Sequence, residues 1–187
     1  MIKCSTQECC HEKEDYILIN FKRDQWIRYD LSDLEQQFAR HLYGQPLVER
    51  IVPKLIKAHL RNDNPEKALV LSFNGMTGSG KNYASKLIAR SLYRKFKQQE
   101  NSEFVNLIIA TRFNYDSTTD INQVKEFFKN NITQAVKKCK RSMFIIDEID
   151  KMPAGIIDVI KPFLDNHPEI DGVDYRKCIF LFLRYVK

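Results

Sequence analysis

The sequence predicts an α/β fold in which helices flank a parallel sheet, and three observations support this class. Short apolar segments of strand length alternate with longer segments whose apolar residues recur at helical spacing. Residues 68–74 are apolar on both faces, which is typical of a central parallel strand covered by helices. The chain of 187 residues is also long enough to bury one hydrophobic core.

Each expected element follows from its apolar spacing and its flanking turns. The first helix is predicted to begin at residue 31 or 33 and to end at Gly44. Further helices are predicted over 46–60, 81–96, 121–138 and 154–164. Strands are predicted over 68–74, 104–110, 142–146 and 178–183. Residues 1–29 show weak periodicity and are expected to form a separate cysteine-containing segment, so the α/β core is predicted over 30–187.

The composition argues against a membrane-spanning protein and against a nucleic-acid partner. No apolar run approaches the roughly 18 residues that a membrane helix needs. With 30 basic and 24 acidic residues, the formal net charge is a modest +6. The densest basic stretch, at Lys137, Lys138, Lys140 and Arg141, has no interleaved aromatic residues, so we interpret it as a solvated helix end.

A glycine-rich turn joins the first predicted strand to a helix, with the spacing of a Walker A phosphate loop. Its residues are Gly75, Met76, Thr77, Gly78, Ser79, Gly80, Lys81 and Asn82. Glycines let successive backbone N–H groups point at phosphate oxygens, and the helix N-terminus adds partial positive charge. Because Lys81 can reach the β- and γ-phosphates, the loop predicts a P-loop NTPase.

Asn82 stands where this motif usually has Ser or Thr. Its amide oxygen can still face a magnesium ion, because magnesium accepts neutral oxygen ligands. We therefore keep Asn82 as a predicted magnesium ligand. The exchange is expected to affect the metal geometry and the turnover rate, and to leave the phosphate site intact.

An acidic pair follows the third predicted strand, in the Walker B arrangement. The apolar strand delivers Asp147 to the carboxyl edge of the sheet, beside the phosphate loop, where it can hold magnesium. Glu148 is the next residue and can polarise the attacking water, so we predict it to be catalytic together with Lys81. Asp150 and Lys151 are interpreted as a surface pair of little energetic value.

Several segments share the pattern of one known family. They are residues 42–45, 78–82, 144–152, 156–165 and 171–173. Within 78–82, Asn82 stands where Ser or Thr is usual. On these residues the chain resembles the torsins, which are Clp-like AAA+ ATPases, and the resemblance covers nearly the whole chain. It implies the large AAA+ subdomain as the fold, ATP and magnesium as ligands, and ATP hydrolysis as the activity. By analogy with Clp-like relatives, Gly44, Gln45 and Ile51 would line the adenine side.

The resemblance also implies partners and a compartment. It implies a homo-oligomer or a ring with a membrane-anchored AAA-like activator, which supplies a missing arginine finger, and it allows peripheral membrane association. It also implies a role in the protein and membrane homeostasis of the endoplasmic reticulum lumen and the nuclear envelope. The first residues contain no apolar run of signal-peptide type, so by themselves they would predict a cytosolic chain.

The cysteines and one asparagine bear on the same compartment. The five cysteines fit no zinc-binding spacing. In an oxidising compartment Cys9 or Cys10 could pair with Cys139, and the residues alone do not establish that pairing. Asn131 begins an N-glycosylation triplet near a predicted helix end. In the torsin resemblance, the family's glycosylated asparagine matches Asn131, its cysteine before the Walker B strand matches Cys139, and its early cysteine pair resembles Cys9 and Cys10.

The chain departs from the family after the last predicted strand. That strand runs into residues 184–187, where the sequence ends without a sensor 1 asparagine. We therefore expect an incomplete core, which lacks the fifth strand and the helical lid. An unprotected strand edge, weakened nucleotide binding and very slow or absent hydrolysis would follow. A fragment, an aberrant gene model and a shortened isoform that poisons rings all fit this pattern.

Two other functions compete with an ATPase. The first is a non-catalytic binding module, in which a nucleotide only stabilises the fold and a partner interface. The second, a small-molecule kinase, is weaker because no segment resembles an arginine-rich lid over an acceptor substrate.

Overall fold

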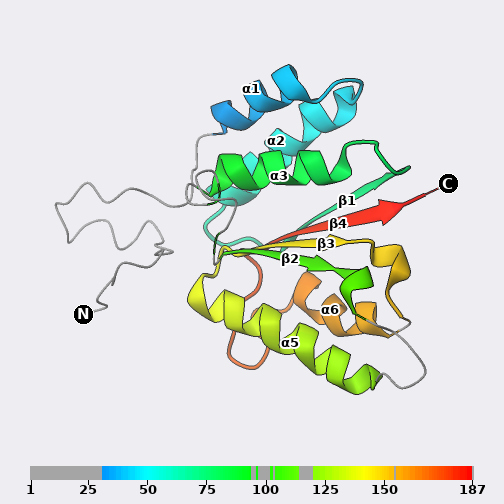
Figure 1. Ribbon diagram of the computed structural model, residues 1–187. Helices are drawn as coiled ribbons and strands as arrows, with labels where there is room; N and C mark the ends of the chain where they lie inside the picture. Colours follow the sequence, from blue (N-terminus) through cyan, green and yellow to red (C-terminus); the bar gives the residue numbers. More distant parts are fainter. Residues whose placement is uncertain are drawn as a thin grey trace.

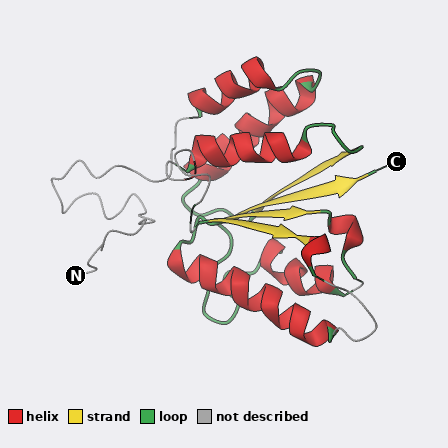
Figure 2. Cartoon of the chain, viewed as in Figure 1, coloured by secondary structure: helices red, strands yellow, loops and turns green. Residues whose placement is uncertain are grey.

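The computed structural model describes residues 31–93, 96, 102, 104–113, 120–153 and 155–186. Helices lie on both faces of a central parallel sheet (Figure 1), and Figure 2 shows the resulting three layers. The predicted α/β class is therefore confirmed. The cysteine-containing segment predicted over 1–29 lies outside the described residues.

The sheet has four strands in the order β1-β4-β3-β2. They are β1 (Leu69–Gly75), β2 (Val105–Ile109), β3 (Met143–Asp147) and β4 (Ile179–Tyr185). Every neighbouring pair is parallel, and β4 lies between β1 and β3. The carboxyl ends of all four strands therefore meet at one edge, toward which the arrowheads in Figure 1 point.

Within the part of the chain that the structure describes, five helices cover the sheet. On one face lie α1 (Ser32–His41), α2 (Pro46–Arg61) and α3 (Lys81–Leu92), and on the other lie α5 (Ile121–Lys138) and α6 (Ile156–Leu164) (Figure 2). Two short 3-10 segments, η2 (Ala110–Arg112) and η3 (Ile149–Lys151), follow β2 and β3. Each helical layer closes its own hydrophobic core against the sheet.

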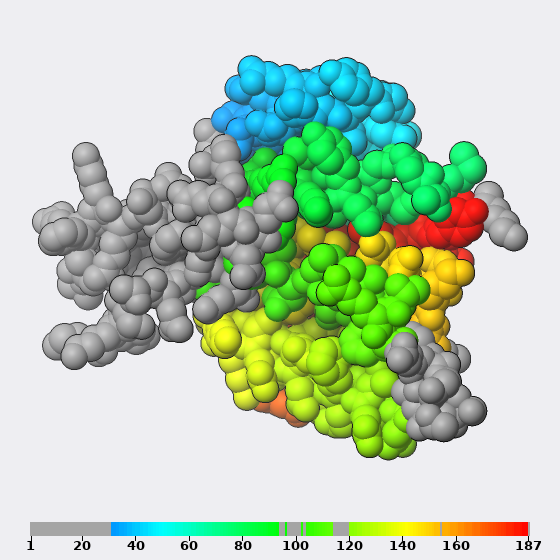
Figure 3. Space-filling view, viewed as in Figure 1, coloured from blue at the N-terminus to red at the C-terminus, as the bar shows by residue number. Residues whose placement is uncertain are grey.

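The two cores follow from the alternation of side chains along the strands. Leu181 of β4 joins the core under α1, α2 and α3, together with Phe38 and Ile88. Its neighbours Phe180 and Phe182 point to the opposite face and join the core under α5 and α6. In the space-filling view the two layers form opposite ends of the molecule (Figure 3). No helix of the described segments is long and apolar enough to cross a membrane.

Most predicted elements are present, with shifted ends. Helix α3 ends at Leu92, before the predicted end near 96, because Tyr93 is extended. The Tyr93 ring is buried, and its hydroxyl donates to the carbonyl oxygen of Arg141 over 2.5 Å. Helix α6 begins at Ile156, after the predicted residue 154, because Gly155 precedes it with a φ of +87°.

The first strand departs from its predicted environment. Strand β1 is an edge strand of this four-stranded sheet and not a central one. Val70 and Ser72 are exposed, whereas Leu71 between them is buried. The reason is that the core under α5 and α6 includes residues of β2, β3 and β4 but none of β1. Among the described residues, β1 therefore forms one edge of the sheet.

Candidate functional site

The loop between β1 and α3 curls tightly at the carboxyl edge of the sheet. Gly78 and Gly80 have φ values of +80° and +88°, a conformation that strains residues with a side chain. A Cβ added to Gly75 would lie 2.7 Å from Oγ of Ser79, so the loop also approaches itself closely. The backbone conformation thus favours glycine at positions 78 and 80, and a side chain at position 75 would force Ser79 to move.

Lys81 is the first residue of α3, and its ammonium group lies within the curl of the loop. Its Nζ donates to the carbonyl oxygens of Gly75 and Met76, both at 2.8 Å, and lies 3.4 Å from Oγ of Ser79. All three partners are uncharged, so they leave the positive charge of Lys81 available to an anion. The backbone N–H groups at the start of α3 add to the attraction.

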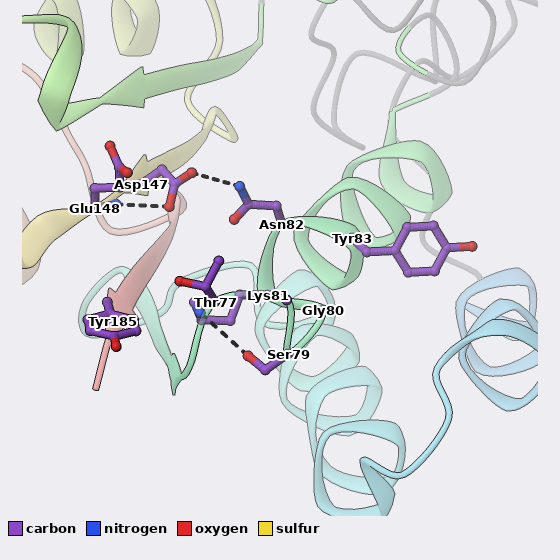
Figure 4. Close-up of a pocket in the computed structure, with 10 residues that line it drawn as sticks. Thr77, Ser79, Gly80, Lys81, Asn82, Tyr83, Asp147, Glu148 and Tyr185 are labelled. Carbon is purple, nitrogen blue, oxygen red and sulfur yellow. Dashed lines mark hydrogen bonds between the residues drawn. The ribbon is translucent and has the colours of Figure 1, made fainter. Parts of the chain in front are cut away.

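The acidic pair lies next to this loop, at the end of β3. The side-chain amide Nδ2 of Asn82 donates to Oδ2 of Asp147 over 2.8 Å (Figure 4). The backbone N–H of Glu148 donates to the other carboxylate oxygen, Oδ1, also at 2.8 Å. The structure therefore brings the two predicted magnesium ligands into direct contact, although they are 65 residues apart in the sequence.

Glu148 is held in an unusual backbone conformation. Its φ of 57° and ψ of 40° lie in the left-handed region, which costs a non-glycine residue about 1 kcal/mol. Its carboxylate accepts a hydrogen bond from the hydroxyl of Thr111, which lies in η2 directly after β2. Thr111 was not predicted at the site. Its signal is a polar residue at the end of a strand that pairs with β3.

The loop and the acidic pair line an open pocket of about 330 Å³. Small-molecule sites commonly have volumes of roughly 300–1,000 Å³. The lining residues are 77–83 together with Asp147, Glu148 and Tyr185. Figure 4 shows that the ring of Tyr83 points away from the acidic pair. Residues 77–82 and Asp147, which the sequence predicted to bind phosphate and metal, therefore share one pocket, whereas Gly75 lines the neighbouring pocket and Met76 lines neither of the two.

Tyr185 is a second residue that the sequence analysis did not predict at the site. It ends β4 opposite Gly75, because β4 pairs with β1. Its backbone N–H donates to Oδ1 of Asp150 over 3.0 Å. Asp150 also lies 3.9 Å from the ammonium of Lys151, so the predicted surface pair exists, but Asp150 additionally ties η3 to the end of β4.

A second pocket of about 350 Å³ lies on the α2 side of the same loop. Gln45 lines it, as predicted for the adenine side, together with Leu42 and Val48, which the sequence analysis did not single out. Gly44 and Ile51 are not among its lining residues. Ile51 is 42% exposed because it lies on the outward side of α2, whereas Val48 turns toward the core.

The donor set at the first pocket suits a magnesium ion. Asp147 offers a carboxylate and Asn82 an amide, and magnesium is commonly bound by one or two such groups plus phosphate oxygens and waters. No group of three or more His, Cys, Asp or Glu that could hold a metal occurs among the described residues.

The predicted glycosylation site lies within a helix and not at its end. Asn131 is exposed on α5, which continues for seven further residues to Lys138, and its Nδ2 donates to the carbonyl oxygen of Phe127 over 2.7 Å. The hydroxyl of Thr133 lies 2.9 Å from the hydroxyl of Tyr175. The helix extends past Asn131 because Ile132, Ala135 and Val136 are buried against the sheet.

The two described cysteines differ in state. Cys139 is disulfide-bonded, and its partner lies outside the described residues, so the pairing with Cys9 or Cys10 stays a prediction. Cys178 is free and fully buried, and its thiol donates to the carbonyl oxygen of Lys140 over 3.4 Å. Burial raises the pKa of the Cys178 thiol, which makes this cysteine chemically inert.

The sequence of this chain is similar to those of known proteins. A family model for torsins matches residues 4–146. A torsin-like protein of Caenorhabditis elegans is 40% identical over 185 residues, which cover 97% of this chain and 47% of the relative. The chain therefore spans about half the length of that curated relative.

Solved structures share the fold at low sequence identity. The S. cerevisiae Hsp104–ADP complex matches 83% of this chain with a TM-score of 0.60 and 18% identity. The extended Hsp104–casein complex of S. cerevisiae matches 84% with a TM-score of 0.61 and 15% identity. In both cases the match covers 28% of the Hsp104 chain.

The parallel sheet and the curled loop at a helix N-terminus define the fold of this protein as that of a P-loop NTPase, and the AAA+ protein Hsp104 shares this fold. Within that class, the chain belongs to the torsin family.

Proposed function

We propose that this chain binds ATP with magnesium and forms the nucleotide-binding core of a torsin-type ATPase. The observation that carries the proposal is the 2.8 Å hydrogen bond between Asn82 and Asp147. It joins the end of the phosphate loop to the acidic pair, so one nucleotide can contact both. The Hsp104 structure determined with ADP supports a nucleotide as the ligand.

Each residue has a role that follows from its position. The amides of the loop 75–80 and the Lys81 ammonium bind the phosphates, and Lys81 exchanges its carbonyl partners for phosphate oxygens. Asn82 and Asp147 would hold magnesium, which neutralises charge on the phosphates when bound. Gln45, with Leu42 and Val48, is suited to the adenine side.

Glu148 is the proposed catalytic base. Its carboxylate would accept a proton from the attacking water while the bond between the γ-phosphorus and its bridging oxygen breaks, giving ADP and phosphate. The hydroxyl of Thr111 orients this carboxylate. We also propose that turnover requires a partner, in keeping with the activator that torsins use.

The compartment and assembly are proposed on family grounds and on one structural feature. We propose the lumen of the endoplasmic reticulum and the nuclear envelope, with a membrane-anchored AAA-like activator in a ring. The disulfide at Cys139 supports an oxidising compartment. The exposed Asn131 is the proposed glycosylation site.

A non-catalytic module is the second candidate. The observation that favours it is Asn82, which stands in place of the usual Ser or Thr, donates to Asp147 and is expected to affect the metal geometry and the turnover rate. In that case ATP would stabilise the fold and a partner surface, and no phosphate would be released.

Nucleotide binding is the first test. Titration calorimetry of the full chain with ATP and ADP, in magnesium and in a chelator, is expected to show ATP binding that magnesium strengthens. A chain that is folded and binds neither nucleotide under either condition would overturn the proposed function.

Single-turnover hydrolysis separates the two candidates. With labelled ATP and an added activator domain, the ATPase releases phosphate, and Glu148→Gln still binds ATP but hydrolyses it at least 100-fold more slowly. Tight activator binding with no phosphate release by the unmodified chain would favour the module.

A further inference from the structure

Asp150 lies in η3, shortly after the proposed catalytic base. The sequence pattern predicted a surface pair with Lys151, and the charged atoms of that pair are 3.9 Å apart. A shorter contact of Asp150 lies elsewhere, because its Oδ1 accepts the backbone N–H of Tyr185 over 3.0 Å. Lys151 is exposed, so the ion pair adds little stability. The bond to Tyr185 instead joins two segments that are 35 residues apart in the sequence.

Asp150 takes the place of a strand partner for the end of β4. The pairing of β3 with β4 ends at Phe182, whereas β4 continues beside β1 as far as Tyr185. On the β1 side, the N–H of Val186 donates to the carbonyl oxygen of Gly75 over 3.3 Å. Since the N–H groups of successive residues point to opposite sides of an extended chain, the N–H of Tyr185 points to the side that β3 has left. The carboxylate of Asp150 satisfies this donor.

The turn that carries Asp150 begins at Glu148. Glu148 has a left-handed backbone, with a φ of 57° and a ψ of 40°, and this conformation leads the chain from the end of β3 into η3. The N–H of Lys151 donates to the carbonyl oxygen of Glu148 over 2.8 Å and closes the turn. A left-handed conformation is costly for a residue with a side chain, so it persists only where surrounding contacts hold it. The bond from Asp150 to the end of β4 is such a contact.

The two segments that Asp150 joins both contribute to the phosphate pocket. Glu148 and Tyr185 are among the lining residues drawn in Figure 4, whereas Asp150 lines neither of the two pockets. Tyr185 pairs with Gly75, whose carbonyl oxygen accepts a hydrogen bond from Nζ of Lys81 over 2.8 Å. One series of contacts therefore runs from the proposed base to the phosphate-binding lysine, and Asp150 lies within it.

We propose that Asp150 is a positioning residue for ATP hydrolysis, an inference that rests on the proposed function of this site. By anchoring η3 to the end of β4, its carboxylate holds Glu148 in the left-handed turn and keeps the Glu148 carboxylate at the hydroxyl of Thr111. Without the anchor, the turn is free to adopt a right-handed or extended backbone, which moves the base away from the attacking water. The phosphate loop keeps its own contacts, so ATP binding is expected to remain.

Three variants separate the hydrogen bond from the charge and from the ion pair. Asp150→Ala removes all three features. Asp150→Asn removes the negative charge but keeps an oxygen that can accept the N–H of Tyr185. Lys151→Ala removes the ion pair and leaves Asp150 intact, so it is the matched control.

Phosphate release and ATP affinity are measured for each variant of the full chain. With protein in excess over labelled ATP and an activator domain added, Asp150→Ala should release phosphate roughly tenfold more slowly than the unmodified chain. Asp150→Asn should recover most of this rate, and Lys151→Ala should retain it. Titration calorimetry should give ATP dissociation constants that agree within about twofold among the four proteins. A slower rate at unchanged affinity distinguishes positioning from general unfolding, which would weaken both.

Amide hydrogen exchange, followed by NMR without nucleotide, tests the contact itself. The N–H of Tyr185 should exchange roughly tenfold faster in Asp150→Ala than in the unmodified chain. It should exchange as slowly as in the unmodified chain in both Asp150→Asn and Lys151→Ala, because each keeps the acceptor.

The outcomes that overturn the positioning role differ from those that overturn the ATPase. Equal phosphate release by the unmodified chain and by Asp150→Ala would remove the role of Asp150 and leave the ATPase intact. Unchanged exchange of the Tyr185 N–H in Asp150→Ala would do the same. An equal loss of rate in Asp150→Asn would assign the effect to charge and so contradict the hydrogen-bond anchor. No phosphate release by the unmodified chain would contradict the proposed ATPase, and any role of Asp150 in hydrolysis with it.

Discussion

Nδ2 of Asn82 lies 2.8 Å from Oδ2 of Asp147, and this contact joins the first turn of α3 to the end of β3. A serine or threonine at position 82 would present a hydroxyl on a shorter side chain, whereas the amide both donates to Asp147 and retains an oxygen acceptor. The contact fixes the loop and the acidic pair on either side of β4, so that phosphates bound by the loop lie close to the metal-binding carboxylate.

The metal dependence of ATP binding should reside in Asp147. Asp147→Asn removes the charge that attracts magnesium but keeps the size of the side chain, so the advantage that magnesium gives to ATP binding should fall by roughly tenfold, which equals about 1.4 kcal/mol. Titration calorimetry with and without a chelator measures it. Asp158→Asn, an exposed change on α6, is the control, and an unaltered magnesium effect in Asp147→Asn would refute the metal assignment.

The loop glycine Gly80 should matter for both stability and binding. Its φ of +88° strains any side chain, so Gly80→Ala should lower the free energy of unfolding by about 1 kcal/mol in urea. Gly172→Ala is a matched change, because Gly172 has a φ of +72° and open space around it. Both variants should be destabilised, but ATP affinity should fall only in Gly80→Ala. Equal ATP affinity in the two would contradict the phosphate loop.

The buried His59 should make the fold less stable in mild acid. Burial lowers the pKa of His59 below its ordinary value of 6.5, with the charge of Arg141 acting in the same direction and hydrogen bonds to the backbone of Lys177 and Cys178 partly opposing it. The unfolded chain then binds more protons than the folded chain as the pH falls below 6.5, so stability decreases toward acid, by at most about 1.4 kcal/mol per pH unit.

Urea unfolding between neutral and mildly acidic pH measures this slope. His59→Gln should flatten it, because glutamine does not titrate. His167→Gln, at an exposed position, should leave the slope as it is. A slope that is the same in the unmodified protein and in His59→Gln would assign the pH dependence to other groups.

The thiol of Cys178 should react only after unfolding. It is 0% exposed, and burial raises its pKa, so the reactive thiolate is rare in the folded protein. Iodoacetamide labelling followed by peptide mass spectrometry should leave Cys178 unmodified in buffer and label it fully in urea. Cys139 should be labelled only after reduction of its disulfide. Fast labelling of Cys178 in the native protein would contradict its placement in the core.

The sequence was sufficient for the parts of the fold with a local cause. Helix α5 has the predicted limits, 121–138, because Asp120 caps it and its apolar residues repeat at helical spacing. The loop 75–82 could be predicted because glycines at fixed spacing have few alternative uses. Asp147 could be placed beside it because parallel strands share their carboxyl edge.

Other features depend on contacts between distant segments. The edge position of β1 follows from the strand order and not from its own apolar pattern. Thr111 and Tyr185 reach the site because β2 and β4 end beside β3 and β1, and neither residue belongs to a short motif. Ile51 was predicted on the adenine side, but the rotation of α2 turns Val48 to the pocket and leaves Ile51 exposed.

The most direct measurement for the central proposal compares two lysines of α3. Lys81 lies within the curl of the phosphate loop, whereas Lys86 is exposed further along the same helix. Titration calorimetry with ATP and magnesium should show binding to the unmodified chain and to Lys86→Ala, and at least a tenfold weaker affinity for Lys81→Ala. Equal ATP affinity in Lys81→Ala and Lys86→Ala would contradict the assignment of this loop as a nucleotide site.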